Sequence, residues 1–128
     1  MNFKIQRTIM EEITLEQIDN LLICAFEGGS NYWYTIKREI EPTVTLYKTI
    51  DYLMPALNPG GALIIVDKNE DEDEAEEYTL NLESIEKGLR LMAESYTFHT
   101  KNFIDGNEDA ETGDVFLQLC LFGEIVFG

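Results

Sequence analysis

The sequence has few cysteines and few histidines, and this shortage bears on redox and metal chemistry. Among 128 residues there are two cysteines and one histidine. Neither Cys24 nor Cys120 has a second Cys or a His at the spacing of zinc ligands. Both cysteines lie among large apolar residues, which is typical of buried, reduced thiols in a cytosolic protein. We therefore expect no disulfide framework and no metal site.

Basic residues and long apolar runs are also scarce. Nine lysines and arginines stand against 25 aspartates and glutamates, so the formal net charge is −16. Because this charge repels phosphates, it argues against direct binding to nucleic acid or anionic lipid. The longest apolar runs, 21–26 and 62–66, are far shorter than the roughly 18 residues of a membrane span, and no signal-peptide core follows Lys4. We expect a neutral or basic partner and no membrane association.

Motifs of the common enzyme classes are missing as well. There is no Walker loop, no G-x-G-x-x-G and no G-x-S-x-G. The single histidine, His99, lies in a polar stretch and is expected at the surface. The sequence therefore predicts a protein that is not an enzyme and has no cofactor.

What the sequence does contain predicts one α+β domain over residues 1–128. Helices are expected over 14–28, 47–57, 82–96 and 109–123, because apolar residues recur there at helical spacing. Strands are expected over 3–9, 32–37, 62–66, 78–80 and 124–127. Thr14 and Gln17 have the spacing of a capping box, and Asn81 is a candidate N-cap. The segment between 97 and 108 is expected as a polar loop. The predicted fold is a four- to five-stranded mixed or antiparallel sheet covered by about four helices.

The helix expected over 82–96 has the clearest apolar period. It predicts Ile85, Leu89 and Met92 in the core. The side chains expected in solvent are Glu83, Lys87, Arg90 and Glu94.

Residues 67–77, called the acidic loop below, contain eight carboxylates and one lysine. An EF-hand loop counted from Asp67 would need Gly at its sixth position and Glu at its twelfth, but Glu72 and Tyr78 stand there. We expect an exposed, mobile hairpin loop, because like charges repel one another. Its functional interpretation is a phosphate-like patch offered to a basic protein.

The segment from Gly28 to Arg38, called the glycine–aromatic segment below, is the most unusual. Two glycines would let backbone N–H groups form an anion-binding nest, with at least one φ above zero. Polar and aromatic side chains follow, and one strand face could stack on a planar ligand. Ordinary core scaffolding is the alternative. The candidate ligand-binding residues are Gly28, Gly29, Ser30, Asn31, Tyr32, Trp33, Tyr34, Lys37, Arg38 and Arg7.

Charge segregation favours the ligand hypothesis. Residues 1–10 and 28–38 contain no Asp or Glu, yet they hold four of the nine basic residues. If the first two predicted strands pair, they would build a basic, aromatic face that can hold an anion.

Two stretches also resemble a family of small proteins encoded by tailed bacteriophages and prophages. The first is Ala25-Phe26-Glu27-Gly28-Gly29-Ser30-Asn31-Tyr32-Trp33-Tyr34. The second runs from Asp109 to Thr112, through Phe116-Leu117-Gln118, to Phe122-Gly123-Glu124-Ile125-Val126-Phe127-Gly128. The resemblance implies a phage accessory protein in a bacterial cytoplasm, where antagonists of host defence are common. It implies no catalytic residues.

These observations leave three functional hypotheses. The first is a non-enzymatic antagonist of host defence that binds a small anionic, nucleotide-like ligand. The second is an acidic nucleic-acid mimic that occupies a basic groove of a host defence protein. The third is a virion or replication accessory protein. A homodimer or larger homo-oligomer is also expected, because an apolar strand over 124–127 would need its edge covered.

Overall fold

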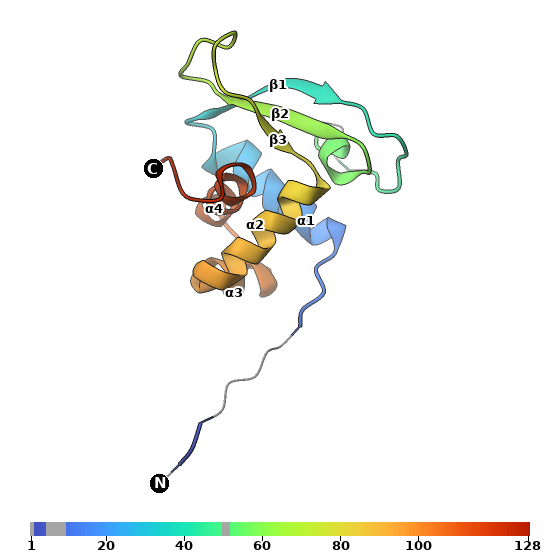
Figure 1. The fold of residues 1–128 in the computed structure, drawn as a ribbon. Helices are drawn as coiled ribbons and strands as arrows, with labels where there is room; N and C mark the ends of the chain where they lie inside the picture. Colours follow the sequence, from blue (N-terminus) through green and yellow to red (C-terminus); the bar gives the residue numbers. More distant parts are fainter. Residues whose placement is uncertain (1, 5–9, 50–51) are drawn as a thin grey trace.

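Three antiparallel strands form a sheet in the order β1 (Tyr34–Ile40), β2 (Ala62–Asp67) and β3 (Tyr78–Leu80). The structure is a computed structural model and describes residues 2–4, 10–49 and 52–128. β2 is central because its apolar run buries both faces, and every side chain from Ala62 to Val66 is at most 4% exposed. The α-helices lie together on one side of the sheet (Figure 1). The α+β class is confirmed, but the described residues form three strands, fewer than the four to five predicted.

The first helical unit begins as its capping box predicts. The Thr14 hydroxyl accepts a hydrogen bond from Gln17 N, and Thr14 N donates to Gln17 Oε1 at 2.9 Å. Helix α1 (Leu15–Cys24) continues into one π-helical turn, η1 (Ala25–Gly29). This unit packs against α4 (Ala110–Phe122), which places the glycine–aromatic segment beside α4.

Local signals also define the other long helices. In α2 (Leu82–Ser95), Asn81 and Ser84 form a reciprocal cap, while Ile85 and Met92 are buried and Leu89 is half-buried. Lys87 is half-buried rather than exposed. Helix α4 begins after Asp109, whose carboxylate accepts from Thr112 N, and ends at Gly123 with φ 76°.

Three predicted elements are wrong. The polar stretch after residue 96 forms a further helix, α3 (Thr97–Ile104), instead of a loop. Of the helix predicted over 47–57, the described residues form only the 3₁₀ turn η2 (Met54–Leu57), because Pro55 can occupy only the first turn of a helix. Residues 124–127 form no strand, since their main chain bonds to the Gln118 side chain. The predicted opening strand lies largely outside the described residues, and Phe3 and Lys4 are not in a strand.

The core lies between the sheet and the helices. Its largest fully buried side chains include Trp33, Phe116, Leu63 and Ile65. No helix in the described part of the chain is long and apolar enough to cross a bilayer.

Candidate functional site

The three aromatic residues of the glycine–aromatic segment separate into different environments. Trp33 is 1% exposed and stacks on Phe127, with ring centroids 4.8 Å apart and planes 10° apart. Tyr34 is half-buried and donates its hydroxyl to Phe26 O at 2.7 Å. Tyr32 is 45% exposed. The tryptophan is therefore part of the core, and its ring is not available to stack on a ligand.

Three polar groups of this segment, those of Ser30, Tyr32 and Trp33, converge on one carboxylate, that of Asp114 in α4. Asp114 Oδ1 accepts hydrogen bonds from Ser30 Oγ at 2.7 Å and from Trp33 Nε1 at 2.8 Å. Asp114 Oδ2 accepts from Tyr32 OH at 2.7 Å and from Gln118 Nε2 at 3.1 Å. Partial burial and then the hydrogen bond to Asp114 raise the pKa of Tyr32 to about 12. The anion bound by this segment is thus an internal one.

The prediction of a glycine nest is wrong. Neither Gly28 nor Gly29 has a positive φ. Gly29 is needed for a different reason, because a Cβ there would overlap the carbonyl oxygen of Ala110 at the start of α4. A Cβ at Gly28 would meet only the Ala110 Cβ at 3.5 Å, an ordinary contact. Gly29 therefore allows close packing against α4, and neither glycine forms an anion-binding nest.

The basic residues of the segment face the acidic loop instead of the glycines. Glu77 accepts ion-pair contacts from Arg38 at 2.9 Å and from Lys37 at 3.1 Å, and Lys37 Nζ also donates to Glu72 O at 3.0 Å. Hydrogen bonds from Arg38, and then from Lys37, lower the pKa of Glu77 to about 2. Arg7, the remaining predicted cation, lies outside the described residues.

The acidic loop is exposed, as predicted, and hydrogen bonds give it a defined shape. Asp71 anchors its turn: Asp71 O accepts from Ala75 N at 2.8 Å, and Asp71 Oδ1 accepts from Asp73 N at 3.0 Å. Ala75 is buried to 8% exposure. The loop projects beyond the sheet, away from the helices (Figure 1). Its predicted mobility stays a prediction.

A shallow hollow of about 480 Å³ lies along β1 and brings together two of the predicted site residues, Asn31 and Tyr34. Thr35, Ile36 and Lys68 complete its lining, and Lys68 Nζ donates to Asn31 O. This hollow therefore holds one cation that was not anticipated from the sequence.

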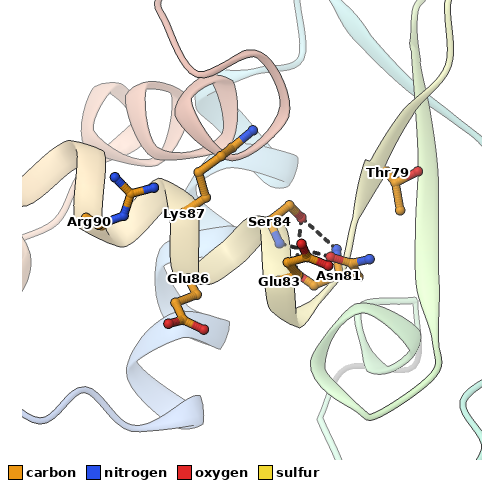
Figure 2. A pocket seen from close by; sticks show the side chains of 7 residues that line it. All are labelled: Thr79, Asn81, Glu83, Ser84, Glu86, Lys87 and Arg90. Carbon is orange, nitrogen blue, oxygen red and sulfur yellow. Dashed lines mark hydrogen bonds between the residues drawn. The ribbon is translucent and has the colours of Figure 1, made fainter.

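A second hollow of about 510 Å³ lies beside β3 and the start of α2 (Figure 2). It is lined by Thr79, Asn81, Glu83, Ser84, Glu86, Lys87 and Arg90. Figure 2 shows the two cationic side chains on one side of the helix and Glu86 on the other. Asn81 and Ser84 bond to each other as the helix cap. None of the predicted site residues that the structure describes lines this hollow.

In the described part of the chain, groups with nucleophilic or metal-binding chemistry are not assembled into a site. Burial raises the pKa of the Cys120 thiol, and burial followed by Glu108 and Asp109 raises that of Cys24, so neither thiol favours its reactive thiolate form. His99 Nδ1 lies 2.9 Å from Thr112 Oγ1. Within the described residues, no three His, Cys, Asp or Glu side chains are placed to hold a metal ion.

Sequence reasoning missed the residues that organise this region: Asp114, Gln118 and Phe127. Gln118 is 1% exposed, and it lies one helical turn after Asp114 in a part of the helix, 115–122, whose other residues are all apolar. This pair of polar residues four positions apart is the signal that could have identified them.

Comparison with protein-family models, with curated proteins and with solved structures finds no match to this chain.

Proposed function

We propose that this protein is a non-enzymatic inhibitor that presents its acidic loop to a basic, nucleic-acid-binding groove of a host defence protein. The observation that carries the proposal is the shaped, outward-facing loop at the end of the β2–β3 hairpin. Of its carboxylates, Glu77 forms ion pairs with other described residues, whereas Glu70, Glu72, Asp73 and Glu74 are exposed and their side chains make no ion pair with a described residue.

Electrostatics supports a basic partner over an anionic ligand. The cations expected to bind an anion, Lys37 and Arg38, are held by Glu77. The polar groups beside them already bind Asp114. A protein of net charge −16 steers cationic surfaces towards itself, and an exposed array of carboxylates resembles the dense charge of a nucleic-acid backbone. The phage context implied by the resemblance suggests a host target in the bacterial cytoplasm.

The test is displacement of fluorescent duplex DNA from a sequence-independent bacterial DNA-binding protein. We expect the wild-type protein to displace the DNA, with an effect that falls steeply as salt rises. The loop-neutralised variant carries Glu70→Gln, Glu72→Gln, Asp73→Asn and Glu74→Gln, and we expect it to lose most of this activity.

The matched control removes the same number of charges elsewhere, through Glu11→Gln, Glu12→Gln, Glu94→Gln and Glu111→Gln. These four side chains are exposed. If the control variant loses as much activity as the loop-neutralised variant, only net charge matters and the assignment to the acidic loop is wrong. If the wild-type protein displaces no DNA at low salt, nucleic-acid mimicry is wrong.

The hollow along β1 supports a second candidate function, binding of a small anionic ligand. Lys68 offers a cation there beside Asn31 and Tyr34. Calorimetric titration of the protein with a set of nucleotides tests this binding. Binding that is lost in Lys68→Ala and kept in the loop-neutralised variant would support this candidate, and no binding at millimolar nucleotide would exclude it.

A further inference from the structure

Residues 124–128, called the closing segment below, are held in the way a protein holds a bound peptide. The buried Gln118 side chain makes three hydrogen bonds to their main chain. Gln118 Oε1 accepts from Val126 N and from Phe127 N, both at 2.8 Å, and Gln118 Nε2 donates to Phe127 O at 3.2 Å. Because only main-chain groups are used, these contacts hold the closing segment without reading its side chains.

One side chain of the closing segment supplies the specificity. The Phe127 ring fits a slot formed by Trp33, at 4.8 Å between centroids, and Phe122, at 5.8 Å. Asp114 orients one wall of the slot and the glutamine that binds the main chain, since it accepts from Trp33 Nε1 and from Gln118 Nε2. The slot is therefore preorganised for one aromatic residue.

The joint before the closing segment is open. Gly123 ends α4 with φ 76°, and a Cβ placed there would have nothing within 4 Å. The next apolar side chains are left in solvent, with Ile125 37% and Val126 55% exposed. The closing segment is thus attached to α4 through Gly123, and it is held by the hydrogen bonds of Gln118 and by the packing of the Phe127 ring.

We propose that the slot is also a docking site for the closing segment of a second copy of this chain, so that two copies exchange segments and form a symmetric dimer. The second copy is the fitting occupant because its segment repeats every contact described above. The exposed Ile125 and Val126, adjacent to the joint, would then lie at the junction between the copies. This proposal is independent of the acidic loop.

Concentration and salt set the balance between the two forms. Within one chain the segment sees its own slot at an effective concentration of about millimolar, so the closed monomer dominates in dilute solution. Two copies of charge −16 repel each other, and added salt screens this repulsion. We expect dimer formation to increase with both protein concentration and ionic strength.

A complementation experiment on the full chain tests the exchange. The Phe127→Ala variant keeps the slot but lacks the ring, whereas the Gln118→Ala variant keeps the ring but loses the main-chain contacts in the slot. We expect each variant alone to be monomeric by light scattering and their equimolar mixture to form a heterodimer. Circular dichroism and thermal unfolding establish that both variants fold. Leu46→Ala, which removes an exposed apolar side chain outside the slot and the closing segment, is the control that should behave as the wild type.

A peptide titration keeps the test sharp if Gln118→Ala folds poorly. The chain has one tryptophan, so fluorescence of Trp33 reports occupation of the slot. The peptide Glu-Ile-Val-Phe-Gly, added to the Phe127→Ala chain, should change this fluorescence, and Glu-Ile-Val-Ala-Gly should bind at least tenfold more weakly. No fluorescence change at millimolar peptide overturns the docking site. If the peptide binds but the two folded variants form no heterodimer, a second copy is not the occupant of the slot. If a dimer forms when both partners lack Phe127, neither the slot nor the exchange of closing segments explains the dimer.

Discussion

At the scale of single residues, the carboxylate of Asp114 determines what the glycine–aromatic segment does. It accepts four hydrogen bonds, three from that segment and one from Gln118. Since hydrogen bonds to an ionised group contribute about 1.5–3 kcal/mol each, this cluster fixes the segment against α4. A second anion placed next to it would be repelled by the same charge.

The two adjacent glycines give a matched pair for testing this packing. Gly29→Ala should destabilise the protein by about 1–3 kcal/mol, because its Cβ would push into the Ala110 backbone. Gly28→Ala should be neutral or stabilising by up to about 1 kcal/mol, since its Cβ has room in a helical turn. Urea unfolding measures both. Equal losses at the two positions would contradict the close approach at Gly29.

The ion pairs of Glu77 predict a pH-dependent difference. Because the pKa of Glu77 is about 2 in the folded protein and 4.5 ordinarily, its stabilising effect is fully present above pH 4.5 and is lost as pH falls towards 2. Glu77→Gln should therefore lower the urea midpoint at pH 7 and have little effect near pH 2. Glu74→Gln is the control, and we expect it to leave the midpoint unchanged at both pH values. A Glu77→Gln effect that is equal at pH 7 and pH 2 would show that the ion pairs do not cause it.

At the scale of elements, those with local signals could be predicted from the sequence. Thr14, Asn81 and Asp109 each cap a helix through a residue three positions on, so the whole signal lies within one turn. The apolar run of β2 and its hairpin partner were also predictable, because one buried strand and its neighbour dominate the local pattern.

In two of the segments whose secondary structure was predicted wrongly, a distant side chain forms hydrogen bonds with main-chain groups. Asn58 Oδ1 accepts hydrogen bonds from Leu46 N and from Tyr47 N, both at 2.7 Å. These bonds hold the main chain at 46–47 in a loop, although the apolar spacing that begins at Tyr47 is typical of a helix. Gln118 does the same for residues 124–127, replacing the neighbouring strand that their composition predicts. The candidate site failed for a similar reason, since Trp33 and Asp114 are 81 residues apart and no local pattern connects them.

The crossing of α2 and α4 predicts coupling between two small residues. A Cβ at Gly88 would overlap Cys120 Sγ, so Gly88→Ala should destabilise by about 1–3 kcal/mol. In the Cys120→Ala background this loss should shrink, because the sulfur is gone. In the Cys24→Ala background it should not change, since Cys24 is not among the nearest contacts of Gly88. Urea unfolding of the three single variants and the two double variants completes two double-mutant cycles. If the losses of unfolding free energy are additive in both cycles, Cys120 does not limit how closely α2 and α4 approach.

At the scale of the whole molecule, the net charge of −16 opposes folding through self-repulsion. Sodium chloride should therefore raise the melting temperature, because the Debye length falls to about 8 Å at physiological ionic strength. The loop-neutralised variant should show a smaller rise. Thermal melts over a salt series measure this, and a melting temperature that falls with salt would mean that attractive ion pairs outweigh the repulsion.

Trp33 donates a hydrogen bond to Asp114 and stacks on Phe127, and both partners are synthesised long after Trp33 leaves the ribosome's catalytic centre. At about 5–20 residues per second, the 81 residues that separate Trp33 from Asp114 take roughly 4–16 seconds to translate. Throughout that interval the indole and the apolar face of α1 lack the helix against which they pack. The nascent chain therefore carries an unprotected apolar surface until α4 emerges, and this is the stage at which chaperones would engage it.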